Sequence, residues 1–74
     1  MNKQRRKQLD KSFGLIDEAR DIIQGVMDDE QEAYDNLPEN FQNGERGEEM
    51  AGYIESLEET VGFLDEAKAA MEDI

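Results

Sequence analysis

The fold is decided at Asn36-Leu37-Pro38-Glu39-Asn40-Phe41-Gln42-Asn43-Gly44, which separates two long segments of helical spacing. Pro38 disfavours helical geometry at Leu37 and is well placed to begin a new turn. Asn43-Gly44 signals a hairpin where strands flank it. The flanking residues here are not strand-like, so we expect the pair to end a short turn and cap the following helix. Residues 36–44 are therefore predicted to be the one turn of the chain.

The residues before the turn predict one long helix, over about 4–35. Apolar side chains recur there at the spacing of one helical face. They are Leu9, Phe13, Leu15, Ile16, Ala19, Ile22, Ile23, Val26, Met27, Ala33, Tyr34 and Leu37, with Glu30 interrupting. Gly14 and Gly25 lie inside the segment, and each costs about 1 kcal/mol relative to Ala. They indicate either a soft or bent helix or a close approach to a neighbouring helix.

The residues after the turn predict a second helix, over about 45–73. Its apolar series is Met50, Ile54, Leu57, Val61, Leu64, Met71 and Ile74, with Lys68 at the one skipped position. Two helices of matching length joined by a short turn should fold back on each other. We therefore expect an all-α protein, an antiparallel two-helix hairpin that forms one domain of residues 1–74.

The size and composition of the chain favour self-association. A chain of 74 residues buries little surface, and without cysteine or histidine it lacks disulfides and the usual zinc ligands. Two hairpins packed as a four-helix bundle would bury both apolar stripes. A homodimer is the leading assembly, and a trimer or higher form remains open. The predicted oligomer seam comprises Leu9, Phe13, Ile16, Ile23, Met27, Ile54, Leu57, Val61, Leu64 and Met71.

The charge of the chain is divided unevenly along the sequence. Residues 1–11 carry a net charge of +4, whereas residues 12–74 carry −16. The basic arm, defined as Lys3, Arg5, Arg6 and Lys7, is a candidate contact for an anion such as phosphate. Alternatively, it neutralises the acidic C-terminal end of the second helix. No aromatic residue is interleaved among its cations, so direct binding of nucleic acid is not expected.

Negative charge should gather at the turn of the hairpin. Residues 28–49 carry nine acids against Arg46 alone, a net charge of −8. We expect a basic partner to dock on Asp28, Asp29, Glu30, Glu32, Tyr34, Asp35, Glu39, Phe41, Glu45, Glu48 and Glu49. The large apolar and aromatic side chains near the turn are Tyr34, Leu37, Phe41 and Tyr53. They form either a small satellite core or an aromatic anchor ringed by carboxylates.

No catalytic or metal site is predicted. An EF-hand calcium loop starting at Asp28 would need glycine where Ala33 stands. Di-iron carboxylate bundles need histidine, and the chain has no nucleophile–base pair and no glycine-rich phosphate loop. We therefore expect no enzyme activity, no cofactor and no metal. The spacing of carboxylates along two adjacent helices approaches the charge density of duplex DNA. The acidic surface indicates mimicry of nucleic acid, a specific protein contact without mimicry, or plain solvation.

The chain is expected to act in the cytoplasm. No apolar run approaches the roughly 20 residues that cross a bilayer. The basic N-terminus is followed by Asp10, Lys11, Asp17 and Glu18 rather than by the apolar region of a signal peptide. An acidic body is also repelled by anionic lipid, so no membrane contact is expected.

Several motifs give the chain a resemblance to known proteins. They are Glu32-Ala33-Tyr34-Asp35-Asn36-Leu37-Pro38-Glu39-Asn40-Phe41-Gln42, Glu45-Arg46-Gly47-Glu48-Glu49-Met50, Lys3-Gln4-Arg5-Arg6-Lys7 and Ile54-x-x-Leu57-Glu58. Together they resemble small acidic helical-hairpin proteins of bacteriophages, prophages and mobile elements of Gram-positive bacteria. The resemblance transfers no activity and no site residues. It implies a context, because small accessory phage proteins often bind host machinery, including defence systems, and inhibit or redirect it.

These features predict a non-enzymatic protein that binds a host protein with a basic surface, such as a defence or nucleic-acid-binding protein. It would do so in the cytoplasm of the host bacterium through its acidic turn and helix faces. One alternative is a structural scaffold that uses its apolar seam to join other helices. Another is an oligomeric sponge in which the basic arms of neighbouring subunits hold an anionic small molecule.

The acidic composition predicts that salt stabilises the protein. Two chains that each carry a net charge of −12 repel one another, and added ions screen this repulsion. We expect the thermal midpoint to rise between about 20 mM and a few hundred millimolar salt. Circular dichroism melts in sodium chloride and in potassium chloride would separate screening from a specific ion effect. A midpoint that falls with either salt would contradict the prediction.

Overall fold

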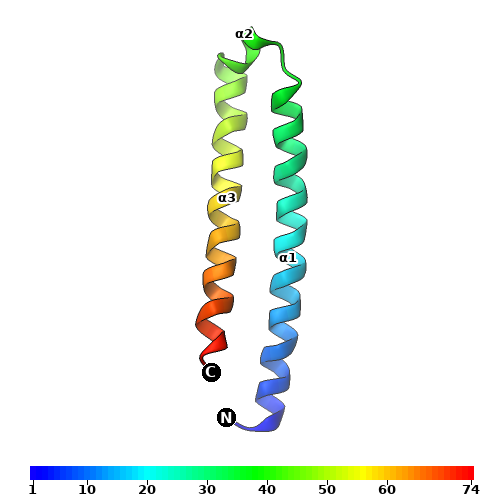
Figure 1. The fold of residues 1–74 in the computed structure, drawn as a ribbon, viewed down its shortest axis with the longest axis vertical. Helices are drawn as coiled ribbons and strands as arrows, with labels where there is room; N and C mark the ends of the chain where they lie inside the picture. Colours follow the sequence, from blue (N-terminus) through cyan, green and yellow to red (C-terminus); the bar gives the residue numbers. More distant parts are fainter.

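The computed structural model describes all 74 residues and contains only helices. They are α1 (Lys3–Asp35), α2 (Glu39–Gln42) and α3 (Glu45–Glu72). The prediction of an all-helical fold is confirmed, and α1 and α3 lie antiparallel against each other (Figure 1). The predicted turn is more ordered than expected, because four of its residues form α2. Pro38 precedes α2 with φ −56°, a value already close to that of a helix.

Helix α1 extends beyond the end of α3, so the basic arm lies past the last turn of its neighbour (Figure 1). Cations at a helix N-terminus oppose the helix dipole. The side chain of Asn2 offsets part of this cost, because it accepts a hydrogen bond from the backbone N–H of Arg5 at 2.8 Å. The hairpin that results is a rod of 58 × 16 × 12 Å.

The corner between the two long helices depends on the side chain and backbone of Gln42. Its side-chain amide donates hydrogen bonds to the carbonyl oxygens of Tyr34 at 3.0 Å and Leu37 at 3.1 Å. The carbonyl group of Tyr34 lies in the last turn of α1, where carbonyl groups lack helical partners, and that of Leu37 lies just beyond the helix. The backbone of Gln42 also presses against α3 at the buried Gly47. The corner therefore joins the end of α1, the whole of α2 and the first turn of α3.

The two long helices meet along a seam of residues that alternate in steps of three and four. On α1 and just beyond it these are Leu9, Phe13, Ile16, Arg20, Ile23, Met27, Glu30, Tyr34 and Leu37; on α3 they are Gly47, Met50, Ile54, Leu57, Val61, Leu64, Lys68 and Met71. Every one of them is half-buried or buried. All ten residues of the predicted oligomer seam lie in this contact within one chain. Their burial between copies of the chain stays a prediction.

The seam buries little surface for a protein of this size. Met50 and Val61 are the only apolar residues in the buried class, each 8% exposed. The accessible surface is 5714 Å², whereas a compact monomer of 8.5 kDa would expose about 4,700 Å². The radius of gyration is 17.1 Å, against about 11 Å for a compact domain of this length. A single hairpin thus leaves much of its apolar surface in water.

The glycines inside the helices differ in what surrounds them. A Cβ atom added at Gly14, Gly25 or Gly62 would meet no atom within 4 Å, so none of them marks a close approach within the chain. Helix α1 continues unbroken through Gly14 and Gly25. A Cβ atom at Gly47 would lie 2.0 Å from the carbonyl oxygen of Gln42. Gly47 is therefore the position where the fold requires glycine.

Alanine at two glycine positions should change stability in opposite directions. Gly47→Ala forces the corner apart and should destabilise the protein by about 1–3 kcal/mol, the usual cost of overpacking. Gly62→Ala is the matched control, and it should stabilise α3 by up to about 1 kcal/mol. Urea denaturation followed by circular dichroism measures both. Equal stabilities for the two variants would contradict the role given to Gly47.

Candidate functional site

The seam divides the surface of the hairpin into two opposite faces. One residue of an α-helix turns by about 100°, so the residue before a seam residue points to one side and the residue after it to the other. Because α1 and α3 run antiparallel, the residues that precede seam positions share one face of the hairpin. The residues that follow seam positions share the opposite face.

The residues that follow the seam form an acidic face. Its members are Asp10, Asp17, Asp21, Asp28 and Asp35 on α1 and Glu48, Glu55, Glu58, Asp65 and Glu72 on α3. All ten are exposed. The other residues that follow seam positions within α1 and α3 are glycine, alanine or glutamine, and none is basic. This face therefore presents two rows of carboxylates along most of the rod.

The residues that precede the seam form an apolar face. Its members are Leu15, Ala19, Ile22 and Val26 on α1 and Tyr53, Ser56, Thr60, Phe63, Ala67 and Ala70 on α3. Leu15 is 56% exposed, and Ile22 and Phe63 are both 62% exposed. Charged residues occupy equivalent positions only near the ends of the rod, as at Arg5 near the N-terminus and at Asp29, Arg46 and Glu49 near the turn.

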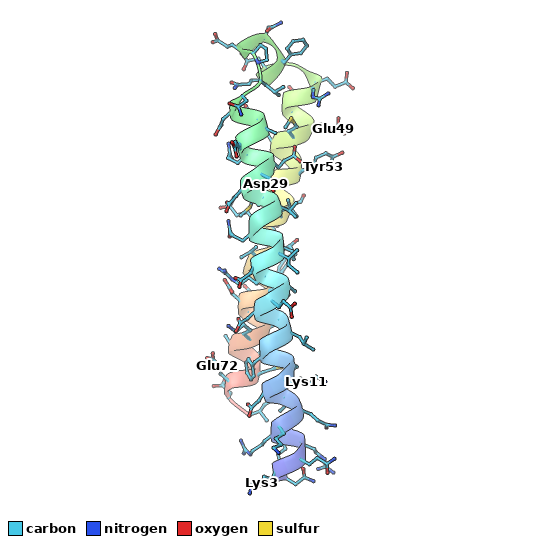
Figure 2. All side chains as sticks on the ribbon, turned by 90° about the vertical axis from the view of Figure 1, so that its right-hand side faces the viewer. Lys3, Lys11, Asp29, Glu49, Tyr53 and Glu72 are labelled. Atoms are coloured by element: carbon cyan, nitrogen blue, oxygen red, sulfur yellow. The ribbon has the colours of Figure 1, made fainter.

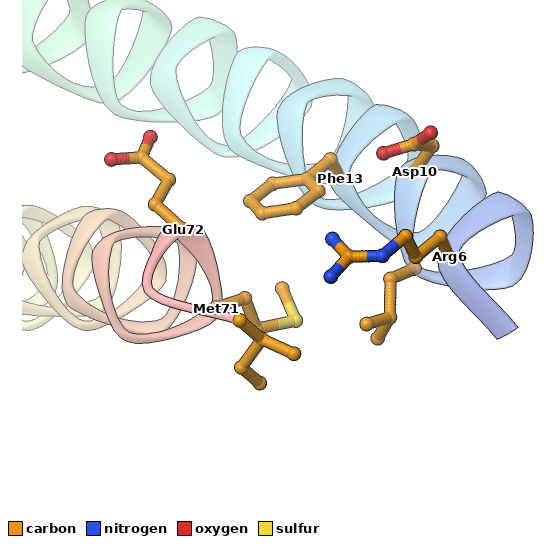
Figure 3. A pocket seen from close by; sticks show the side chains of 7 residues that line it. Arg6, Asp10, Phe13, Met71 and Glu72 are labelled. Carbon is orange, nitrogen blue, oxygen red and sulfur yellow. The ribbon is translucent and has the colours of Figure 1, made fainter. Parts of the chain in front are cut away.

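Two shallow grooves confirm that the faces join residues from both helices. One groove, of about 360 Å³, brings Ala33 of α1 together with Arg46, Glu49 and Tyr53 of α3, all of which precede seam residues. The other, of about 330 Å³, is lined by Asp10 of α1 and Glu72 of α3, which both follow seam residues (Figure 3). The two helices thus contribute alike to each face.

Two ion pairs hold the helices together beside the acidic face. Arg20 donates from Nε to Asp65 Oδ1 at 2.7 Å and from a terminal nitrogen to Oδ2 at 3.3 Å, and Lys68 pairs with Asp17. The hydrogen bond from Arg20 lowers the pKa of Asp65, and the hydrogen bond to Asp17 raises the pKa of Lys68. Asp17 and Arg20 are three residues apart on α1, and their partners Lys68 and Asp65 are three residues apart in the reverse order on α3. Both pairs therefore form in the same antiparallel register.

The predicted docking residues at the turn are distributed over several surfaces. Asp28, Asp35 and Glu48 lie on the acidic face, whereas Asp29 and Glu49 lie beside the apolar face. Glu30 and Tyr34 are half-buried in the seam. The remaining members, Glu32, Glu39, Phe41 and Glu45, are exposed on the outer side of α1, on α2 and at the start of α3. Figure 2 shows Asp29, Glu49 and Tyr53 toward the turn, far from Lys3.

The four large residues near the turn do not share one environment. Tyr34 and Leu37 are half-buried in the seam, while Phe41 on α2 is 50% exposed and Tyr53 on α3 is 52% exposed. The phenol of Tyr53 donates a hydrogen bond to Glu49 at 2.5 Å, and this bond raises the pKa of Tyr53. Tyr53 therefore belongs to the groove with Arg46 and Glu49, and Phe41 projects separately from the corner.

The basic arm makes no ion pair within the chain. The only two ion pairs are Arg20–Asp65 and Lys68–Asp17, so Asp65 is occupied by Arg20 and not by the arm. The guanidinium of Arg6 points toward the groove at the open end, between Phe13 and Met71 (Figure 3). Asp10 and Glu72 line the same groove and would repel an anion. The arm is thus free for a contact outside its own chain.

The carboxylates are dispersed over the rod and do not gather around one point. No three acidic side chains converge closely enough to hold a metal ion. Neither long helix contains a stretch that is both apolar and long enough to cross a bilayer. No known protein family, curated protein or solved structure matches the chain. The candidate site is therefore a pair of surfaces, one acidic and one apolar.

The apolar face was not identified from the sequence as a separate surface. Its signal was present, because Leu15, Ile22 and Phe63 each stand directly before a seam residue. A single helix does not show which neighbouring stripe lies beside the stripe of another helix. That relation appears only when the antiparallel register is known.

The Arg20–Asp65 pair predicts a stability difference that depends on pH. Folding lowers the pKa of Asp65, so its contribution is present above the unfolded value of about 3.8 and is lost as pH falls through the folded value. At pH 7, Asp65→Asn should melt a few degrees below Glu66→Gln, a neighbouring exposed acid with no ion pair. The two variants should converge near pH 2. A gap that persists at pH 2 would contradict the ion-pair explanation.

Proposed function

We propose that the protein is a non-enzymatic, phage-type accessory protein that binds a host protein through its acidic face and turn. The observation that supports this proposal is the acidic face, whose ten carboxylates have no cation among them. Only Asp17 and Asp65 are neutralised by ion pairs within the chain. The other eight are available to a basic partner surface, such as that of a defence or nucleic-acid-binding protein.

The spacing of these carboxylates supports mimicry of nucleic acid. From Asp10 to Asp35 the acidic face covers about 38 Å of helix, which gives about one carboxylate per 4 Å. Duplex DNA carries one charge per roughly 1.7 Å, and one side of the duplex presents about half of them. A partner built to hold one side of a duplex would meet a similar density of charge on this rod.

We also propose that the chain works as a homodimer in the cytoplasm of its host. The shallow core supports self-association, because it leaves Leu15, Ile22 and Phe63 more than half exposed. A dimer would display two acidic faces, so it could engage a partner twice or engage a symmetric partner. The same exposed side chains support a second candidate function, a scaffold that joins helices of other proteins through the apolar face.

The binding proposal is tested with two triple variants of equal charge. The tagged protein is used to recover a partner from a Gram-positive lysate, and native mass spectrometry weighs the complex. Asp28→Asn, Asp35→Asn and Glu48→Gln neutralise the acidic face near the turn. Loss of three charges there should weaken binding at least about tenfold, and the affinity of the unaltered protein should fall with salt.

The control variant neutralises three acids that lie outside the acidic face. Glu18→Gln, Glu59→Gln and Glu66→Gln remove the same charge from positions two residues beyond the seam. This variant should bind within about threefold of the unaltered protein, because electrostatic attraction at a contact depends on where the charges lie. Equal losses in both variants would contradict the acidic face as the docking surface. A partner that binds independently of salt and of both variants would favour the scaffold function.

A further inference from the structure

We propose that a second copy of the chain covers the apolar face, with the two hairpins face to face and their turns at opposite ends. The inference rests on the self-association proposed above and adds the surface and the orientation. In this dimer the basic arm of each copy lies beside the acidic turn of the other. Two observations on the single chain carry the argument, one of area and one of charge.

The area of exposed surface is sufficient for a stable dimer. The chain exposes about 1,000 Å² more than a compact monomer of its mass would, by the comparison of 5714 Å² with about 4,700 Å². A standard protein interface buries about 800 Å² on each partner, and obligate homodimers bury more. A second hairpin laid along the rod would therefore bring the exposed surface of each chain to the value of an ordinary folded protein.

The side chains of the apolar face differ in size in a way that would let two copies of the face interdigitate. Large residues, Leu15, Ile22 and Phe63, alternate with small ones such as Ala19 and Ala67. Large side chains from one hairpin can enter the spaces over small side chains of the other. None of the apolar-face positions from Leu15 to Val26 on α1, or from Tyr53 to Phe63 on α3, holds a charged residue.

The acidic face excludes the opposite arrangement, in which the hairpins meet through their other sides. Ten carboxylates without a cation would face ten more, which is strongly unfavourable. Contact through the apolar face instead keeps both acidic faces pointing away from each other. The partner that covers the apolar face must therefore offer an apolar surface of the same length. A second copy of the chain has such a surface.

The charges at the two ends of the rod favour one of the two possible orientations of the paired hairpins. If both turns lie at the same end, two segments of net charge −8 meet there, and two basic arms meet at the other end. If the turns lie at opposite ends, each basic arm meets the acidic turn of the partner. The apolar face is centred near Ile22 and Phe63, so such a dimer aligns the arm with the partner's turn about 22–28 Å from the centre.

This orientation also gives the arm a role that the single chain does not. Helix α1 carries the arm past the end of α3, where no ion pair forms within the chain (Figure 1). At about the same distance on the other side of the centre lie Glu49 and Glu45, about 21 and 27 Å from Phe63 along α3. The overhang of α1 is therefore the length that reaches the acidic turn of an oppositely oriented copy.

The surface is tested by analytical ultracentrifugation across a range of protein concentrations. Ile22→Gln with Phe63→Gln should raise the dimer dissociation constant at least about 100-fold, because each change removes a contact from both copies. Ala51→Gln with Ala69→Gln, which adds the same side chains to the opposite face, should leave the constant within about threefold. A dimer unaffected by the first pair would overturn the surface.

The orientation is tested in a chain whose apolar and acidic faces are unaltered. The protein contains no cysteine, so Asn43→Cys places a single spin label at the turn. Turns at opposite ends give a label separation of about 60 Å, whereas turns at the same end give less than about 25 Å. The longer distance supports the proposed orientation, and the shorter one overturns it.

A further pair of measurements separates this inference from the proposed binding function. Replacing all four arm residues, Lys3, Arg5, Arg6 and Lys7, by Gln should raise the dimer dissociation constant several-fold at 50 mM salt and less at 500 mM. The acidic-face variant with three amides should still dimerise while it loses its partner. A chain that stays monomeric at every concentration overturns the dimer but leaves partner binding open to its own test.

Discussion

The fold depends on the close contact between the backbone of Gln42 and the surface of Gly47. No side chain fits between them, since even a Cβ atom at Gly47 would overlap the carbonyl group of Gln42. The side-chain amide of Gln42 meanwhile donates hydrogen bonds to one carbonyl group in the last turn of α1 and to another just beyond it. The corner therefore fixes where α3 begins relative to the end of α1. Every later pairing, including those of Arg20 with Asp65 and Lys68 with Asp17, inherits this register.

The fixed antiparallel register of α1 and α3 places the acidic residues of both helices on one face and the apolar residues on the opposite face. Residues just after seam positions are acidic on both helices, and residues just before them are largely apolar, so antiparallel packing gathers each kind on its own face. This sorting limits what the two helices can achieve alone. They share one narrow seam, in which Met50 and Val61 are the only apolar side chains that are buried, each 8% exposed. The shallow core and the exposed apolar face are thus two consequences of the same packing.

Much of the fold could be predicted from the sequence because helical periodicity and a turn signal are local properties. The apolar series located both long helices, and Pro38 located the break between them. Three features could not be predicted. The need for glycine at Gly47 arises from the path of α2, and the sequence alone does not distinguish it from Gly62. The ion pairs and the apolar face both require the register. The sequence left two interpretations of the basic arm, contact with an anion or neutralisation of the acidic end of the second helix. The structure shows that α1 carries the arm past the end of α3, where it forms no ion pair with Asp65.

The distribution of charge connects the two proposals. In a dimer with turns at opposite ends, the arms neutralise much of the turn, where the sequence alone places the strongest negative charge. The acidic face would then be the largest uncompensated charge in the assembly. A basic partner is attracted most strongly where carboxylates lack cations. Docking should therefore extend along the helices, through residues such as Glu55 and Glu58, and not be confined to the turn. A partner that follows the rod for about 38 Å would meet the acidic face as it would meet one side of a duplex.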